Sequence, residues 1–222
     1  MIIAIDGPSG AGKSTLGKRL ARAFGLLYLD TGAMYRAVGY ASMRAGLSED
    51  EDAAIAELAA SSKITLEGIG DTQRVYLNGE EITSQIRTPE VSHRASVVSA
   101  IPDVRTELVR RQQMLGKAAE QGAILDGRDI GTVVFPNADI KFFLTADAES
   151  RAQRRYREDL AKGLDVTFEH TLQEIKKRDT RDATREHSPL IKAPDAIEID
   201  TSSLNEDEVF EKLAEIVRRV RS

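Results

Sequence analysis

The chain has 222 residues and a net charge of −5, with 41% hydrophobic and 30% charged residues. This balance is ordinary for a folded domain and too apolar for a disordered chain, and the length fits one core with at most an insertion. The absence of cysteine excludes disulfides, thiolate zinc sites and cysteine nucleophiles, and the three histidines lack metal-ligand spacing.

Neither a membrane span nor a secretion signal is expected. The longest apolar stretches, residues 1–5 and 140–144, are far shorter than the roughly 18 residues that a membrane helix needs. No lysine or arginine precedes the opening apolar run, as one would in a signal peptide. We therefore expect a cytoplasmic monomer with no membrane partner, and the acidic net charge argues against a nucleic-acid polymer as ligand.

The first quarter of the chain predicts two buried strands, each followed by a helix. Residues 2–6 form a short apolar run that ends in an aspartate, and residues 26–30 form a second such run. Between them Leu16, Leu20 and Phe24 recur every four residues, which is typical of a helix with one apolar face. The stretch after Gly32 has helical spacing as well.

A different rhythm follows over residues 62–86. Residues 63–67 and 73–77 alternate between apolar and polar side chains, and Asn78-Gly79 leads into residues 80–82. Asn-Gly between alternating runs is a strong hairpin signal because both turn positions need a positive φ. We expect a small antiparallel sheet here, set into the main fold either as part of a mobile flap or as an inert insertion.

The second half of the chain returns to buried strands and helices. Residues 123–126, 140–144 and 196–200 read as further strands, so a parallel sheet covered by helices on both faces is predicted. The last helix should begin near Asn205, with Glu208 as its capping partner. Its expected buried face consists of Val209, Leu213, Ile216, Val217 and Val220.

Residues 7–14 read G-P-S-G-A-G-K-S and match the phosphate-binding pattern G-x-x-x-x-G-K-S/T. The match lies directly after a predicted strand and before a predicted helix, where backbone N–H groups can surround an anion. A plain glycine turn is the alternative, and the context favours the cradle. Lys13 can reach the β- and γ-phosphates, and Ser14 can bind Mg²⁺. The expected ATP-binding residues of this segment are Gly7, Pro8, Ser9, Gly10, Ala11, Gly12, Lys13, Ser14 and Thr15.

The phosphate cradle alone fits switch GTPases, ATPase motors and small-molecule kinases. A switch GTPase needs N-K-x-D and D-x-x-G motifs, and neither occurs here. The chain is also short for a motor domain. A kinase of a small acceptor is therefore favoured, and it must hold a second substrate opposite the cradle.

Basic side chains are concentrated where such an acceptor site is expected. Residues 151–185 contain ten Lys and Arg against seven Asp and Glu, on an otherwise acidic chain. The helical spacing places Arg178, Arg181 and Arg185 along one side of a helix, and Arg151, Arg154 and Arg155 form a second cluster. Exposed, salt-bridged helices are the alternative. Together with a phosphate cradle, the clusters predict an anionic ligand.

Two further polar segments, at residues 30–36 and 126–129, directly follow predicted strands. When these segments are included, the chain resembles the bacterial cytidylate kinase family along its whole length. The matching segments are residues 5–15, 29–36, 126–136 and 177–185. The first is shared by many P-loop proteins, whereas the last two together are specific. The resemblance implies one P-loop kinase domain of the nucleoside monophosphate kinase type over residues 1–222. Within it, a five-stranded parallel sheet carries a monophosphate-binding insertion at residues 36–100 and a lid at residues 150–166.

The resemblance also implies the reaction, in which the γ-phosphoryl group of ATP passes to CMP or dCMP with Mg²⁺ present. It assigns the cytosine to Ser96, Arg105 and Asp129, and the sugar to Arg178 and Asp182. Arg36, Arg128 and Arg185 would bind the acceptor phosphate, with Thr31 as a further contact. Arg154 and Arg155 would approach the ATP phosphates, and the implied catalytic residues are Lys13, Arg155, Arg178 and Arg185.

Asp126 ends a predicted strand beside the cradle strand, so we consider it with Ser14 as a metal-binding residue, acting through water. A strand-end cap is the alternative for Asp126. Two other functions remain open at this point, namely a P-loop kinase of another small acceptor and a non-catalytic ATP-binding module.

Overall fold

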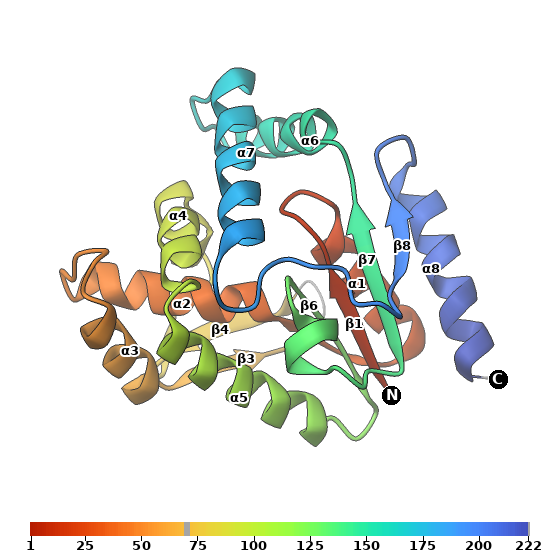
Figure 1. Ribbon diagram of the computed structural model, residues 1–222, viewed down its shortest axis with the longest axis horizontal. Helices are drawn as coiled ribbons and strands as arrows, with labels where there is room; N and C mark the ends of the chain where they lie inside the picture. Colours follow the sequence, from red (N-terminus) through yellow and green to blue (C-terminus); the bar gives the residue numbers. More distant parts are fainter. Residues whose placement is uncertain (69–71, 222) are drawn as a thin grey trace.

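The computed structural model describes residues 1–68 and 72–221. Its centre is a five-stranded parallel sheet in the order β2-β6-β1-β7-β8 (Figure 1). The expected fold class is confirmed, and two of the strands begin one residue later than expected. The strands are β1 (Ile2–Asp6), β2 (Leu27–Asp30), β6 (Ala123–Gly127), β7 (Ile140–Thr145) and β8 (Ile197–Asp200).

Helices cover both faces of this sheet. Along β1, Ile3 and Ile5 pack into the cluster that contains α1 (Lys13–Phe24) and α8 (Glu206–Arg221), whereas Ala4 points to the opposite face. The opposite face is covered by α5 (Pro102–Ala118) and by a π-helical turn, η3 (Ile130–Val134). Alternate side chains of a strand point to opposite faces, and apolar residues on both sides therefore give a sheet buried between two layers.

The last helix begins as the sequence predicts. Asn205 and Glu208 exchange backbone-to-side-chain hydrogen bonds of 2.8 and 2.9 Å, the reciprocal arrangement of a capping box. Val209, Leu213 and Val217 are buried and Ile216 is partly buried. The prediction for Val220 is wrong, because this side chain is 50% exposed near the end of the helix.

A second hydrophobic cluster lies beside the sheet and holds the antiparallel strands. The expected hairpin turn is present, with φ of 52° at Asn78 and 89° at Gly79. Part of the expected region, residues 69–71, lies outside the described residues. The insertion boundaries of 36–100 stay a prediction, since this cluster extends from Ala33 to Leu108. Its elements besides α5 are α2 (Thr31–Arg44), α3 (Asp52–Ser61), β3 (Ile64–Glu67), β4 (Arg74–Leu77), β5 (Glu80–Glu81), η2 (Gln85–Arg87) and α4 (Pro89–Val98).

Two more helices, α6 (Ala148–Ala161) and α7 (Phe168–Thr184), pack against each other beyond the carboxyl ends of the strands (Figure 1). In Figure 1, α7 lies beside α4, and the two helices are in contact. The lid predicted at residues 150–166 covers most of α6 and the segment before α7 and stays a prediction. Within the described part of the chain, no helix has the length and apolarity to cross a membrane.

Candidate active site

The phosphate-binding motif forms the loop between β1 and α1, as the sequence predicts. Backbone conformation and the close approach of neighbouring atoms together favour glycine at two of its positions. At Gly7, with φ of +145°, a Cβ would lie 2.1 Å from the carbonyl oxygen of Leu144. At Gly10, with φ of +80°, a Cβ would lie 3.0 Å from the Cβ of Arg151 on α6. The loop therefore passes directly against β7 and α6, and α1 begins at its end, where Lys13, Ser14 and Thr15 line the cavity.

Lys13 is the first residue of α1, and only 6% of its surface is exposed. Its Nζ donates to the carbonyl oxygen of Pro8 at 2.6 Å. Burial and the nearby Arg128 guanidinium lower the pKa of the Lys13 ammonium well below its usual value. Both causes disfavour a cation in this place, so an anion in the cavity would stabilise the charged form.

Ser14 and Asp126 lie together, and a tyrosine completes the group. Ser14 Oγ donates to Asp126 Oδ2 at 2.7 Å, and the Tyr28 hydroxyl donates to Oδ1 at 2.9 Å. The sheet register sets Asp30 beside Asp126. Burial, and then the charge of Asp30, raises the pKa of Asp126. A hydroxyl and a carboxylate next to a phosphate cradle suit Mg²⁺, which prefers one or two carboxylates together with substrate phosphates.

The predicted base readers Arg105 and Asp129 form a buried ion pair, although 24 positions separate them. Arg105 Nη1 also donates to the Ser99 carbonyl at 3.0 Å, and its guanidinium lies 5.6 Å from the centre of the Tyr35 ring. Ser96 is 5% exposed and accepts a hydrogen bond of 2.9 Å from Arg181 Nη1. Its neighbours Ala95 and Ser99, rather than Ser96 itself, line the cavity described below.

The predicted sugar and phosphate residues also come together, with one change of partner. The resemblance assigns Arg178 and Asp182 together to the sugar, which makes Arg178 the expected partner of Asp182. Instead, Arg128 Nε donates to Asp182 Oδ2 at 2.8 Å. Burial, and then repulsion by Arg128, lowers the pKa of Arg178 to about 10. Thr31 Oγ1 donates to the carbonyl of Asp126 at 2.6 Å and therefore lies where the two predicted substrates would meet.

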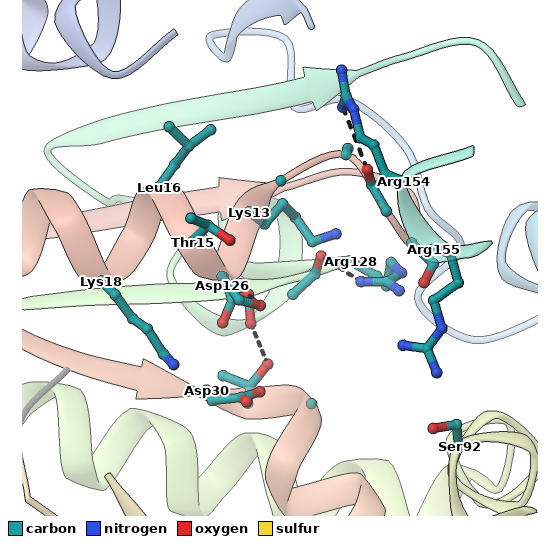
Figure 2. A pocket seen from close by; sticks show the side chains of 18 of the residues that line it. Lys13, Thr15, Leu16, Lys18, Asp30, Ser92, Asp126, Arg128, Arg154 and Arg155 are labelled. Carbon is teal, nitrogen blue, oxygen red and sulfur yellow. Dashed lines mark hydrogen bonds between the residues drawn. The ribbon is translucent and has the colours of Figure 1, made fainter. Parts of the chain in front are cut away.

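The two arginines of the predicted lid make different contacts. Arg154 donates to Thr201 Oγ1 at 3.0 Å and reaches the carbonyl of Gly10 at 3.5 Å. Arg155 donates to Asp159 at 2.9 Å, and 34% of its side chain is exposed. Figure 2 shows Lys13 and Arg128 pointing toward the same region of the pocket, with Arg155 beside it.

Apart from Gly7, Pro8 and Ser96, the predicted site residues line one cavity of ≈ 1240 Å³ (Figure 2). Within the described residues, four of its arginines each carry a buried nitrogen that has no hydrogen-bond partner. Buried donors are almost always paired in folded proteins, so these nitrogens indicate an acceptor-rich ligand. The four nitrogens are Arg36 Nε, Arg105 Nε, Arg178 Nε and Arg185 Nη2.

Three positions in or behind this site were not assigned as site residues from the sequence, although Arg151 was predicted as part of a basic cluster. Asp6 ends β1 and accepts the N–H groups of Ile130 and Gly131 at 2.8 and 2.7 Å, which fixes the turn after Asp129. Arg151 joins the cradle to α7, since it donates to the Ser9 carbonyl at 3.1 Å and pairs with Asp179 at 2.6 Å. The third is Tyr28. A polar residue at the end of a buried strand was a usable signal for Asp6, whereas no pattern in the sequence distinguishes Tyr28 from a core aromatic.

A phosphate cradle that faces an arginine-rich wall across one cavity defines a P-loop phosphotransferase with a small, phosphorylated acceptor. Comparison with known proteins narrows this class. The model of the cytidylate kinase family matches residues 3–219. The chain is 48% identical over 215 residues to the cytidylate kinase of Ligilactobacillus salivarius, a match that covers 97% of this chain and 95% of that protein. It is 51% identical over 218 residues to the cytidylate kinase of Caldicellulosiruptor bescii, with 98% and 96% covered.

The chain therefore belongs to the cytidylate kinase family. A solved structure of an uncharacterized protein from Eubacterium ventriosum matches with a TM-score of 0.51 and 14% identity, and the match covers 100% of this chain and 99% of that one. At this identity the likeness concerns the fold alone.

Proposed function

We propose that the protein transfers the γ-phosphoryl group of ATP to CMP or dCMP, giving ADP and CDP or dCDP. The observation that carries the proposal is the single cavity with a phosphate cradle on one side and four unpartnered arginine nitrogens on the other. Membership of the cytidylate kinase family gives the acceptor. Both observations fit an enzyme that holds two nucleotides with their phosphates facing.

On the donor side, residues 7–15 would bind the phosphates of ATP through backbone N–H groups, with Lys13 between the β- and γ-phosphates. Arg154 and Arg155 would approach from α6. In this role Lys13 exchanges the Pro8 carbonyl for a phosphate oxygen, which favours its charged form.

On the acceptor side, the buried Arg105–Asp129 pair suits the edge of cytosine. Cytosine offers the N4 amino group as a donor beside the N3 and O2 acceptors. Asp129 would accept from N4, while Arg105 and Ser96 would donate to N3 or O2. Uracil sets an oxygen against the carboxylate instead, and such a mismatch costs about 1–3 kcal/mol, roughly a tenfold to hundredfold preference.

The rest of the acceptor would lie along α7 and the segment after β6. Asp182 is an acceptor-only group suited to a sugar hydroxyl, with Arg178 beside it. Arg36, Arg128 and Arg185 would bind the acceptor phosphate, with Thr31 as a further contact. The unpartnered nitrogens of Arg36, Arg178 and Arg185 support this arrangement, because phosphate oxygens can accept from each of them.

Ser14 and Asp126 would hold Mg²⁺, with Asp126 acting through water, and the oxygen donors present fit this ion. When bound there, Mg²⁺ neutralises negative charge on the donor phosphates. Tyr28 keeps the Asp126 carboxylate in place by its hydrogen bond of 2.9 Å.

Phosphoryl transfer requires alignment of the two substrates and stabilisation of spreading charge rather than covalent work by the protein. Lys13, Arg155, Arg178 and Arg185 would surround the transferring group with positive charge. A general base is unnecessary, because a phosphate monoester has its second pKa at about 6 and is already anionic near neutral pH. Closure of the predicted lid, residues 150–166, over the site would exclude water and prevent hydrolysis of ATP.

The direct test is ADP release from ATP with CMP, dCMP, UMP, AMP or GMP as acceptor. We expect the highest kcat/KM with CMP and dCMP and little ADP without an acceptor. Equal rates with every acceptor would point to another small-molecule kinase. ATP binding without ADP release under any condition would indicate a non-catalytic module.

We further propose that the protein works on free nucleotides, as a monomer in the cytoplasm, without a nucleic-acid or membrane partner. The net charge of −5 supports the part that concerns nucleic acid. Analytical ultracentrifugation across a range of concentrations tests the monomer, and a single species near the mass of one chain is expected.

A further inference from the structure

Arg181 on α7 is a cation of the predicted cluster to which neither substrate gives a role. Its Nη1 donates to Ser96 Oγ on α4 at 2.9 Å, across 85 positions of the sequence. The two helices lie side by side (Figure 1). Neither residue is among the described residues that line the cavity, whereas Ala95 and Ser99 close to Ser96 do line it.

The bond joins the two halves of the acceptor site. On α7 and at the residue that follows it, Arg178, Asp182 and Arg185 line the cavity and flank Arg181 in the sequence. On α4 and the turn after it, Ala95 and Ser99 line the cavity on either side of Ser96. A movement of α7 away from α4 would therefore separate the predicted sugar and phosphate contacts from the predicted base contacts.

Ser96 also connects to the base reader. Ser99 Oγ donates to the carbonyl of Ser96 at 2.8 Å, and the carbonyl of Ser99 accepts from Arg105 Nη1 at 3.0 Å. Arg105 in turn pairs with Asp129. A continuous series of contacts therefore runs from Arg181 on α7 to the buried ion pair that faces the base.

The chemistry of the bond fixes the Ser96 hydroxyl as well. A guanidinium has five N–H donors and no acceptor, so the Ser96 oxygen must accept and its one proton points away from Arg181. A buried hydroxyl that accepts from a cation is held more firmly than one with neutral partners, because charge-assisted hydrogen bonds are the stronger kind.

We propose that Arg181 is a positioning residue, which acts through Ser96 to hold the base-reading wall on α4 in register with the sugar- and phosphate-binding wall on α7. This inference rests on the proposed function, since it concerns the site of the acceptor nucleotide. Arg181 itself touches neither nucleotide.

A double-mutant cycle tests the inference, with Arg181→Met, Ser96→Ala and the double variant. Hydrogen bonds to charged groups are worth enough that Arg181→Met should raise the KM for CMP about tenfold. The KM for ATP and kcat should change by less than about twofold, the usual scatter between independent sites. In the Ser96→Ala background, Arg181→Met should add less than about twofold to the KM for CMP.

Two further variants separate positioning from general structure. Lys177→Met is the matched control, because Lys177 is a cation on the same helix. Its side chain is 69% exposed and forms an ion pair of 2.9 Å with Glu174. It should leave both KM values unchanged. Arg181→Lys keeps a donor of shorter reach and should recover at least about threefold of the loss in KM. If Arg181→Met fails to fold, Arg181→Lys replaces it in the cycle.

Three results would overturn the inference: an unchanged KM for CMP in Arg181→Met, equal losses for CMP and ATP, or the same factor in the Ser96→Ala background. A wild-type protein that forms no CDP would overturn the proposed function instead. In that case the four proteins of the cycle would be compared by the rise in melting temperature that CMP produces. The inference is supported if Arg181→Met reduces this rise when Ser96 is present and has no further effect in the Ser96→Ala background.

Discussion

The two sides of the cavity are built in opposite ways. The proposed donor side is one continuous segment, residues 7–15, whose backbone N–H groups would do most of the phosphate binding. The acceptor side takes side chains from distant parts of the chain, so that Arg36 on α2, Arg105 on α5, Arg128 after β6 and Arg185 at the end of α7 face one space. One side is local in sequence and the other exists only after folding.

From this difference we infer that substrate specificity resides on the acceptor side. Backbone N–H groups and a helix N-terminus bind phosphate without regard to the base attached to it. The acceptor side instead pairs its cations with carboxylates, as in Arg105 with Asp129, Arg128 with Asp182 and Arg36 with Asp30. Fixed donors and acceptors can distinguish one base edge from another, and we therefore expect donor-side substitutions to reduce rate and acceptor-side substitutions to change substrate preference.

The largest effect should come from Lys13→Met. This change removes the one buried cation of the donor loop, and loss of a positioned donor at a developing charge typically costs about a hundredfold to a thousandfold in kcat. Lys212→Met, an exposed cation on α8, is the control and should keep full activity. Steady-state kinetics with CMP make the comparison, and a Lys13→Met enzyme with a normal kcat would remove the lysine from the mechanism.

Asp6 at the end of β1 accepts hydrogen bonds from the turn after Asp129 and so connects the two sides of the cavity. Its effect should appear in the pH dependence of the free energy of unfolding. Burial raises the pKa of Asp6 from 3.8 to about 6. The folded state thus binds this proton more tightly than the unfolded state does. Protonation of Asp6 therefore stabilises the fold below about pH 4, and this stabilisation is lost as the pH rises through about 6. The full contribution to the free energy of unfolding is about 3 kcal/mol.

Urea unfolding between pH 4 and 7 measures this contribution. The Asp6→Asn variant cannot titrate there, so the wild-type curve should fall relative to the variant curve as the pH rises. Parallel curves for the two proteins would show that Asp6 has an ordinary pKa.

A change of preference is the expected effect of Asp129→Asn. The amide can donate where the carboxylate only accepts, so it disfavours the N4 amino group of cytosine and suits O4 of uracil. The ratio of kcat/KM for CMP to that for UMP should fall about a hundredfold, while the KM for ATP stays within about twofold. An equal loss for CMP and UMP would contradict the base-reading role.

The smallest effect should follow Tyr28→Phe. This variant removes the hydroxyl that donates to Asp126 at 2.9 Å and keeps the buried ring. Loss of one such hydrogen bond should raise the Mg²⁺ concentration needed for half-maximal rate roughly fivefold. Activity titrations against Mg²⁺ test it, with Ser14→Ala as a companion that should act in the same direction. An unchanged Mg²⁺ requirement in both would separate this group from the metal.

The sequence alone predicted the sheet, the cradle and the hairpin because each depends on neighbouring residues. Apolar runs gave the strands, the match at residues 7–14 gave the loop, and Asn78-Gly79 gave a turn that needs positive φ. The prediction that Val220 is buried was wrong, because helical spacing predicts the face on which a residue lies and not where the covering layer ends.

The acceptor side shows why the rest could not be predicted. Helical spacing set Arg178 and Asp182 near each other, yet Asp182 pairs with Arg128 from a segment 54 positions away. Asp6 and Tyr28 likewise act through residues more than 90 positions distant. Contacts of this kind follow from the parallel order of the strands, which places β1 and β2 on either side of β6, and local patterns do not contain that information.

If one cavity holds two nucleotides with their phosphates facing, a crystal structure with CMP and a non-hydrolysable ATP analogue will show both at once. We expect the triphosphate along residues 7–15 and the cytosine ring beside Arg105 and Asp129. A base bound away from this pair, or a triphosphate outside the loop, would contradict it.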